Sequence, residues 1–479
     1  MIDKVKDFDF SRLRSLDFYR SFFMGKAYPA VIALLIFVGN VTGLEYYFNF
    51  IITGLLLFSL SICHSIRPGI IVFCAYVYQI SLDHGPNYPN YSDFFYTGWR
   101  LPVSIIIICA VSASFIIFFF KNKMYKRISV KNTPFLVPLL AFSAALFLSG
   151  AFSDVWIPKN LLFGLFNFLV YFGFFIFIYH GFAEDESAEE LGKYFAYVTL
   201  LISFILVGQV IHLYLTSDNV FIDGSINKVG VALGWGIWNL VGNSLAVLIP
   251  TLFYGVMVNK YPWLYFTMAT LTYVAAVFTM SRNALVFATL AYGACIIISA
   301  FVGKHKLAFR IIIAVGIFAV ALFMIVFFSK IKAILGDYFE RGFSDNGRYS
   351  LWSQAFDNFL NGIVFGRGFY GFDVDTAVFG PLPKQAHNTV LQLLSSLGIV
   401  GLLTYAYYRV KTALIFFKKP NVMKTMLGIS ILTLLFGSLL DNFVFNIYPL
   451  LSYNVALAIC AHSYKEDCVS ESKMSLKQS

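Results

Sequence analysis

Charged residues are scarce in this chain. Aspartate, glutamate, lysine and arginine together make up 13% of its 479 residues, whereas hydrophobic residues make up 59%. Soluble proteins carry charge on roughly a quarter of their residues, so this composition excludes a soluble globular protein of this length. Many apolar stretches approach or exceed the ~20 residues that cross a bilayer as a helix. The sequence therefore predicts an all-α, polytopic helical membrane protein.

Signals for metal binding and for secretion are also lacking. None of the six cysteines has metal-ligand spacing, and none lies in the large polar loop near 330–386, so we expect neither a disulfide nor a metal site. We expect no cofactor. The first 27 residues are polar and basic, without a short apolar core that ends in small residues. We therefore expect no cleavable signal peptide.

Polar residues divide the apolar sequence into about 12–14 predicted transmembrane helices. The second and third of these are short, so twelve spans with a re-entrant pair are the alternative. The predicted helices lie near 28–44, 48–63, 69–82, 101–120, 134–153, 161–183, 194–216, 231–258, 261–280, 284–302, 307–329, 387–410, 425–440 and 443–462.

The net charge of +10 could indicate nucleic-acid binding, but the distribution of lysines and arginines across a membrane explains it better. With the N-terminus in the cytoplasm, most lysines and arginines fall on the inner side, as the positive-inside rule requires. Both termini then lie inside, and one large loop, 330–386, lies outside. The resulting segments are a cytoplasmic start (1–27), N-terminal membrane helices (28–229), a region with the large loop (230–410), C-terminal helices (411–462) and a cytoplasmic tail (463–479).

The large loop contains a predicted amphipathic helix. Its sequence "RYSLWSQAFDNFL" begins at Arg348 and puts apolar residues on one stripe at helical spacing. Such a stripe lies on the bilayer surface or packs onto the membrane helices. Both arrangements place Arg348 near the level of the lipid headgroups. The stripe consists of Leu351, Trp352, Ala355, Phe356, Phe359 and Leu360.

Three ionisable residues at the predicted outer surface are candidates for function. Arg282 lies in a tight turn between two apolar helices, Arg348 begins the loop helix, and His387 lies at the first turn of the next membrane helix. Taken singly, they fit a snorkelling anchor, a loop charge and a structural histidine. Together they lie on one side of the membrane, and helix N-termini with arginines favour anions such as phosphate.

Other polar residues support less specific hypotheses. The pair Asp373 and Asp375 has the "DVD" spacing that binds a metal-nucleotide sugar in many soluble glycosyltransferases, but a solvated loop is the favoured interpretation. Asn239 and Asn243 share a helix face beside small residues, where close helix packing is the alternative explanation. Asp441, between the last two membrane helices, is a candidate support for the site.

The order of these motifs resembles the O-antigen ligase and polymerase family, which consists of membrane glycosyltransferases of the C-type architecture. The matching stretches span about 230–410 and comprise "NLVGNSLAVLIP", "MSRNALV", "NGRYSLWSQAF", "FGRGFYGF" and "HNTVLQLLSSLGIVGLL". The resemblance implies transfer of a glycan from undecaprenyl pyrophosphate to an acceptor hydroxyl at the extracytoplasmic face of the bacterial inner membrane. It further implies metal-independent, inverting chemistry.

The resemblance also assigns roles to residues. Arg282 and Arg348 would bind the pyrophosphate, and His387 would accept the proton of the acceptor hydroxyl. Arg367, Asn388 and Asn243 are further expected substrate contacts. Some family members have a glutamate five residues after the histidine, where this chain has Gln392. The carboxylate partner of His387 must therefore come from elsewhere, and Asp441 is the candidate.

Several functions remain open from the sequence. A polymerase would use a second lipid-linked oligosaccharide as acceptor, whereas a ligase would use another molecule; we slightly favour the polymerase. Expected partners are the lipid-linked donor, a glycan or lipid-linked acceptor, membrane lipids and a chain-length regulator, but no nucleic acid. A flippase for lipid-linked oligosaccharides is the alternative from another class, although the sequence shows no repeats of the kind that transporters use. An assembly subunit would need neither a base nor a phosphate site.

Overall fold

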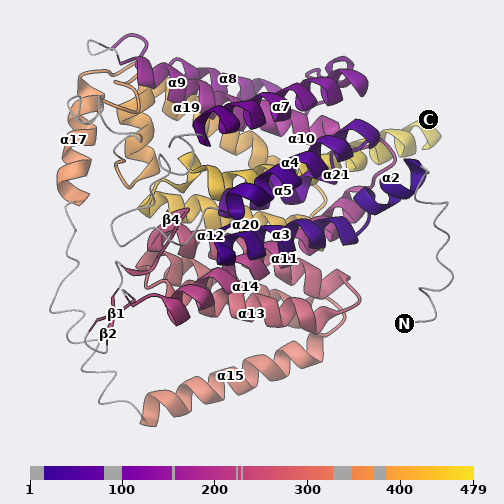
Figure 1. Ribbon diagram of the computed structural model, residues 1–479, viewed down its shortest axis with the longest axis vertical. Coiled ribbons are helices and arrows are strands. Elements are labelled where there is room, and N and C mark those ends of the chain that lie inside the picture. The colour runs from indigo at the N-terminus through magenta and orange to yellow at the C-terminus, as the bar shows by residue number, and fades with distance from the viewer. Residues whose placement is uncertain are drawn as a thin grey trace.

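A computed structural model describes residues 16–79, 100–153, 157–218, 220–222, 225–227, 230–326, 348–371 and 385–478. Helices make up most of this part of the chain, and most of them run roughly side by side (Figure 1). Within the described ranges, eight helices are long and apolar enough to cross a membrane. A ninth is added if α2 (Leu16–Met24) and α3 (Ala27–Thr42), which meet at an angle of 67°, count as one span. The predicted all-α, polytopic membrane class is confirmed.

The first half of the chain is built from helices of very different length. Their bounds are α4 (Glu45–Ile62), α5 (Gly69–Ala75), α7 (Arg100–Lys121), α8 (Leu136–Phe147), α9 (Pro158–Phe168), α10 (Phe174–Gly181) and α11 (Ala188–Thr216). A π-helical turn, η4 (Leu169–Gly173), joins α9 to α10, and short 3₁₀ turns are η2 (Tyr76–Tyr78) and η3 (Met124–Lys126). Two short hairpins follow: β1 (Phe221–Ile222) pairs with β2 (Ser225–Ile226), and β3 (Ala232–Leu233) pairs with β4 (Gly236–Ile237).

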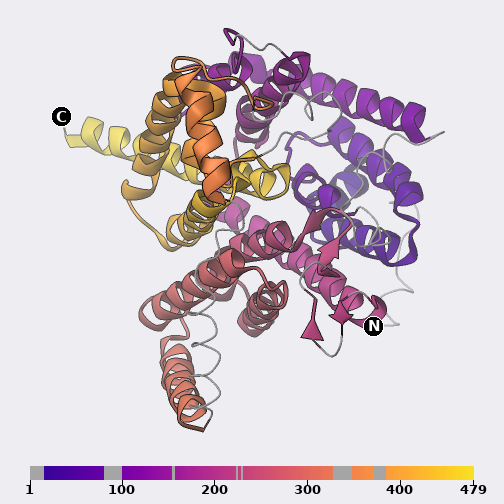
Figure 2. The ribbon, with the colours of Figure 1, turned by 90° about the vertical axis from the view of Figure 1, so that its left-hand side faces the viewer.

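The second half of the chain carries most of the candidate residues. Its helices are α12 (Trp238–Val258), α13 (Pro262–Phe278), α14 (Arg282–Phe301), α15 (Lys306–Val326), α17 (Arg348–Leu360), α19 (Thr389–Phe417), α20 (Val422–Leu440) and α21 (Ile447–Gln478), with the 3₁₀ turn η6 (Phe443–Phe445) before α21. Figures 1 and 2 show α15 at the edge of the helix bundle, and α17 beside α19.

Some predicted spans are shorter than expected. The described part of the predicted helix 69–82 forms the seven-residue α5 and one 3₁₀ turn, and the predicted helix 134–153 contains the twelve-residue α8. A helix of twelve residues covers roughly 18 Å, which is less than the ~30 Å apolar core of a bilayer. The predicted second span, by contrast, is a full eighteen-residue helix, α4. These short apolar helices explain why the count by length falls below the expected 12–14 in the described ranges.

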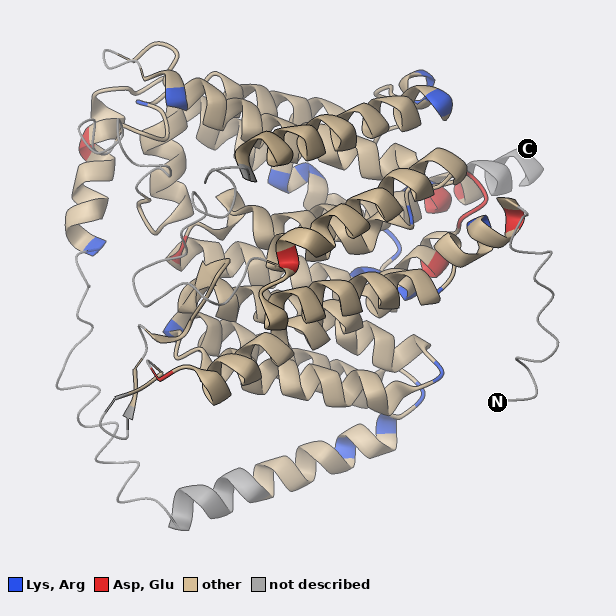
Figure 3. Ribbon diagram, in the orientation of Figure 1, with Lys and Arg blue, Asp and Glu red and all other residues tan. Residues whose placement is uncertain are grey.

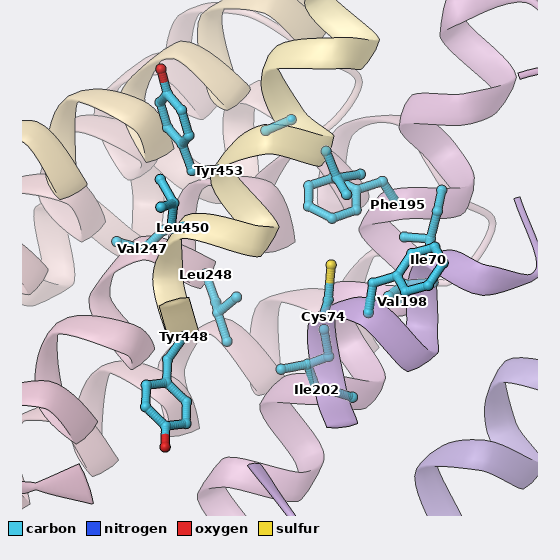
Figure 4. Packing of buried hydrophobic residues seen from close by; sticks show 14 of the residues in the cluster. Ile70, Cys74, Phe195, Val198, Ile202, Val247, Leu248, Tyr448, Leu450 and Tyr453 are labelled. Atoms are coloured by element: carbon cyan, nitrogen blue, oxygen red, sulfur yellow. The ribbon is translucent and has the colours of Figure 1, made fainter. Parts of the chain in front are cut away.

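Helix α12 forms the centre of the bundle. Of its most apolar stretch, 94% of the residues are buried. The helix packs against α11, α13, α14 and α20. Figure 4 shows the core where Val247 and Leu248 of α12 meet residues of three other helices. These are Ile70 and Cys74 from α5, Phe195, Val198 and Ile202 from α11, and Tyr448, Leu450 and Tyr453 from α21. The most buried helix thus begins with Trp238 and Asn239, which fixes their position near the candidate site.

Lysines and arginines gather at one end of the bundle, the end from which α21 emerges (Figure 3). This asymmetry is the pattern that the positive-inside rule describes. The orientation itself stays a prediction, as does the division of the chain into segments. Much of the predicted outer loop, including Asp373 and Asp375, lies outside the described residues.

Candidate functional site

His387 lies immediately before helix α19 and not within its first turn. Asn388 is the N-cap, and its side-chain oxygen accepts hydrogen bonds from the backbone N–H groups of Val390 (2.9 Å) and Leu391 (3.1 Å). Asparagine is among the preferred N-cap residues, which explains why the helix begins at Thr389, two residues later than predicted. His387 has a φ of 49°, in the left-handed region that residues with a Cβ seldom occupy. Asn388 was expected to contact substrate, and its side-chain oxygen is engaged in this cap.

The imidazole of His387 contacts a buried carboxylate. Its Nδ1 lies 2.7 Å from Oδ1 of Asp441, which directly follows α20. The His387 side chain is 39% exposed, whereas that of Asp441 is 9% exposed. A carboxylate on Nδ1 favours the tautomer that carries the proton there, so that Nε2 is the proton acceptor. The predicted pairing of His387 with Asp441 is therefore present in the structure.

Asn239 connects this pair to the helix of Arg282. Its Nδ2 donates to Oδ2 of Asp441 (3.2 Å), and its Oδ1 accepts a hydrogen bond from Oγ of Ser281 (2.8 Å). Ser281 is the N-cap of α14 and accepts from the backbone N–H of Ala284. Arg282 was predicted to lie in the turn before a helix near 284–302; it is the first residue of α14 and is exposed. One chain of hydrogen bonds thus runs from His387 to the cap beside Arg282.

Asn243 lies one turn below Asn239 and is buried. Its Nδ2 donates to the backbone carbonyl of Asn239 (2.8 Å), and only 2% of the residue is exposed. Because the two asparagines share a helix face, the expectation from their spacing holds. The expected contact between Asn243 and substrate stays a prediction, and its position suits support of Asn239.

Helix α17 brings Arg348 towards the same region. Arg348 is the first residue of α17, and Trp352, one turn later, donates from Nε1 to the backbone carbonyl of Ala386 (3.0 Å). Ala386 directly precedes His387 and packs with Ala355 of α17, and both are fully buried. The predicted apolar stripe thus docks partly on α19, while Phe356 and Leu360 remain exposed.

Gln392 holds together the two segments that carry His387 and Asp441. Its Oε1 accepts hydrogen bonds from the backbone N–H of Ala386 (2.8 Å) and from Nδ2 of Asn442 (2.9 Å). Its Nε2 donates to Oγ of Ser396 (2.7 Å). A glutamate would lack this donor. The glutamine therefore positions the dyad through its neighbours, while Asp441 supplies the carboxylate.

Arg367 belongs to a loop that inserts into a break of α19. The predicted helix 387–410 is not continuous, because Gly398 has a φ of 66°. The backbone N–H of Arg367 donates to the carbonyl of Ser395 (2.9 Å), and its Nη1 donates to Oδ1 of Asn358 in α17 (3.2 Å). Arg367 therefore helps to hold α17 against α19, and its expected phosphate contact stays a prediction.

Two polar residues of this network were not predicted from the sequence. Ser281 carries the connection from Asn239 to α14, and Asn442 binds Gln392. The cap pattern of Ser281, a serine directly before an apolar helix, was the available signal. Within the part of the chain that the structure describes, no group of three or more His, Cys, Asp or Glu residues is arranged to hold a metal ion.

Residues 266–406 match the O-antigen ligase family. No curated protein matches the chain. The matched region contains Arg282, Arg348 and His387, whereas Asn239 and Asp441 lie outside it. The match confirms the family identified from the motifs, and it supports a function of the O-antigen ligase or polymerase type.

Proposed function

Because residues 266–406 match the O-antigen ligase family, we propose that this protein is a glycosyltransferase that uses polyprenyl-pyrophosphate-linked glycans. It moves a glycan from undecaprenyl pyrophosphate to an acceptor hydroxyl, at the extracytoplasmic face of a bacterial inner membrane. A second lipid-linked glycan is the favoured acceptor, which makes the reaction a polymerisation. An acceptor of another kind, as in a ligase, is the alternative outcome.

The observation that carries this proposal is the 2.7 Å contact between His387 and Asp441. The Nε2 of His387 takes the proton of the acceptor hydroxyl while that oxygen attacks the anomeric carbon of the donor. The bond from this carbon to the pyrophosphate oxygen breaks, with inversion at the carbon. The carboxylate of Asp441 stabilises the imidazolium that forms, and such base catalysis contributes typically ~10²–10⁴-fold.

The departing pyrophosphate gains negative charge, which cationic groups at the site must neutralise. Arg282 and Arg348 each begin a helix, so each guanidinium lies beside the partial positive charge of a helix N-terminus. Guanidinium groups bind phosphate oxygens bidentately and remain charged, which suits a mechanism without a metal ion. Arg367 provides a third cation close to α17. No cofactor is needed for this chemistry.

Reconstitution with a lipid-linked oligosaccharide tests the proposal. Purified protein in liposomes should release polyprenyl pyrophosphate and produce longer glycans, both measured by mass spectrometry. The variants His387→Ala and Asp441→Asn should lose turnover by about 100-fold or more with intact folding and with little change in donor affinity. A chelator should change the rate little. Full activity of the His387→Ala variant would refute the base, and transport without glycan transfer would favour a flippase.

A further inference from the structure

A second polar site lies at the other end of the bundle from His387. A cavity of about 510 Å³ is bounded by the segment before α8, by the last turns of α19 and by α21. Lys411, on this rim, lies in the last turns of α19, whereas the candidate site lies at its beginning. Because α19 is long and apolar enough to cross a membrane, the cavity lies towards the face opposite the candidate site.

Three lysines from three separate segments surround this cavity. Lys131 precedes α8, Lys411 belongs to α19, and Lys465 belongs to α21. All three are exposed, and no aspartate or glutamate lines the cavity. None of the ion pairs among the described residues involves any of the three lysines. Converging cations without a protein counter-ion attract an anion.

The nearby acidic residues are occupied elsewhere. Asp467 pairs with Lys424 (2.6 Å), and Glu471 pairs with Lys418 (3.0 Å). Glu466 accepts a hydrogen bond from the backbone N–H of Ala188 (3.0 Å). The lysines of the cavity therefore keep their charge uncompensated by these neighbours.

The remaining lining of the cavity is largely apolar. Val130, Val137 and Leu414 expose 69%, 49% and 52% of their surface, respectively. Asn132 adds a polar residue to the lining, while the hydroxyl of the buried Thr133 is hydrogen-bonded to His180 (2.8 Å). The aromatic rings of Tyr407 and Tyr464 complete the wall. Polar and cationic groups thus adjoin exposed aliphatic side chains, the combination that suits a phosphate headgroup with acyl chains attached.

We propose that this cavity binds the headgroup of an anionic phospholipid. The phosphate lies among Lys131, Lys411 and Lys465, and the acyl chains run along Val137 and Leu414 into the bilayer. Basic pockets between membrane helices are known to bind anionic lipid headgroups, and each lysine near an anionic surface contributes roughly 1 kcal/mol. The site is separate from the proposed glycan transfer, so its test does not depend on that reaction.

Lipid titration of the full-length protein tests this site. The apparent Kd for phosphatidylglycerol is measured by native mass spectrometry in a neutral detergent, with phosphatidylcholine as the zwitterionic comparison. The triple variant Lys131→Gln, Lys411→Gln, Lys465→Gln should bind phosphatidylglycerol about 100-fold more weakly, since each lysine accounts for about fivefold. Phosphatidylcholine should bind both proteins equally weakly.

The matched control removes three exposed lysines that do not line the cavity: Lys123→Gln, Lys126→Gln and Lys304→Gln. It changes the net charge equally and should keep the affinity for phosphatidylglycerol. Equal losses in both triple variants would show general surface attraction and overturn the site. Displacement of the lipid by inorganic phosphate at equal ionic strength would also overturn it, in favour of a soluble anion. If the triple variant does not fold, Lys411→Gln alone should show the fivefold loss.

Discussion

At the residue scale, the environment of Asp441 determines what His387 can do. A buried carboxylate is costly unless donors surround it. Asp441 receives hydrogen bonds from Asn239 at one oxygen, and from the backbone N–H of Asn442 at the oxygen that contacts His387. These donors satisfy the buried carboxylate and fix its orientation, and the carboxylate in turn orients the imidazole. The proton acceptor at Nε2 is thus prepared before substrate binds.

Loss of Asn239 should show whether this residue positions Asp441 for catalysis or only supports the fold. In the variant Asn239→Ala, Asp441 loses one donor and the link to Ser281, so kcat should fall about 10- to 100-fold with little change in KM. Turnover of the reconstituted protein measures this effect. Asn454→Ala removes another buried asparagine that bonds only to backbone carbonyls, and it should keep its kcat. Equal loss in both variants would indicate a general effect on folding.

Gln392 has a role in the site that the sequence did not indicate. The family resemblance implied a glutamate at this position in some members, so the glutamine left the carboxylate partner of His387 to come from elsewhere. In the structure the glutamine bonds to Ala386 and Asn442, which adjoin the two members of the dyad. The sequence indicated that the carboxylate comes from elsewhere, and only the fold shows how Gln392 contributes.

At the element scale, the break in α19 places the loop of Arg367. The N–H groups of Ile399 and Val400 donate to the carbonyls of Ile363 and Val364, so the interrupted helix is satisfied by the loop. A membrane interior requires such internal pairing because no water replaces lost hydrogen bonds. The sequence predicted a continuous span, since a glycine in an apolar helix does not by itself reveal a break.

Gly398→Ala should therefore destabilise the protein. The added Cβ would collide with the carbonyl of Val364, and the positive φ disfavours alanine. We expect a loss of at least about 2 kcal/mol, seen as a lower thermal unfolding temperature in detergent. Gly293→Ala in α14 is the control, because nothing lies within 4 Å of its added Cβ. That variant should be as stable as the unaltered protein or slightly more stable, and an equal result for Gly398→Ala would contradict the break.

At the scale of the whole molecule, the two ends of the bundle differ in charge and in chemistry. One end carries the dyad and the beginnings of α14, α17 and α19, and the other end collects lysines and arginines (Figure 3). This division agrees with the proposed reaction at one face of the membrane. The orientation that this division predicts can be tested in intact cells.

Cysteine labelling tests the orientation. The variant Ser350→Cys places an exposed thiol in α17, and Lys304→Cys places one between α14 and α15. A membrane-impermeant maleimide should label the first in intact cells and the second only after the membrane is permeabilised. The unaltered protein gives the background from its own cysteines, of which Cys109 is exposed. Labelling of both sites, or of Lys304→Cys alone, in intact cells would contradict the proposed sidedness.

The sequence by itself determined the class of this protein and its candidate residues. Scarce charge and long apolar runs require a membrane bundle, and arginines or a histidine at span ends stand out because burial of charge is costly. These inferences depend only on local composition, which can be read directly from the sequence. Helix lengths were less certain, as α5 and α8 show, because apolar residues do not distinguish a span from a short buried helix.

Only the tertiary structure decided which residues meet. The contact of His387 with Asp441, the bond from Asn239 to Ser281 and the insertion of the Arg367 loop into α19 all join segments far apart in the chain. Such contacts depend on how α12, α19 and α20 pack, which no local pattern specifies. The same holds for the three lysines of the opposite cavity, whose convergence results from the packing of α8, α19 and α21.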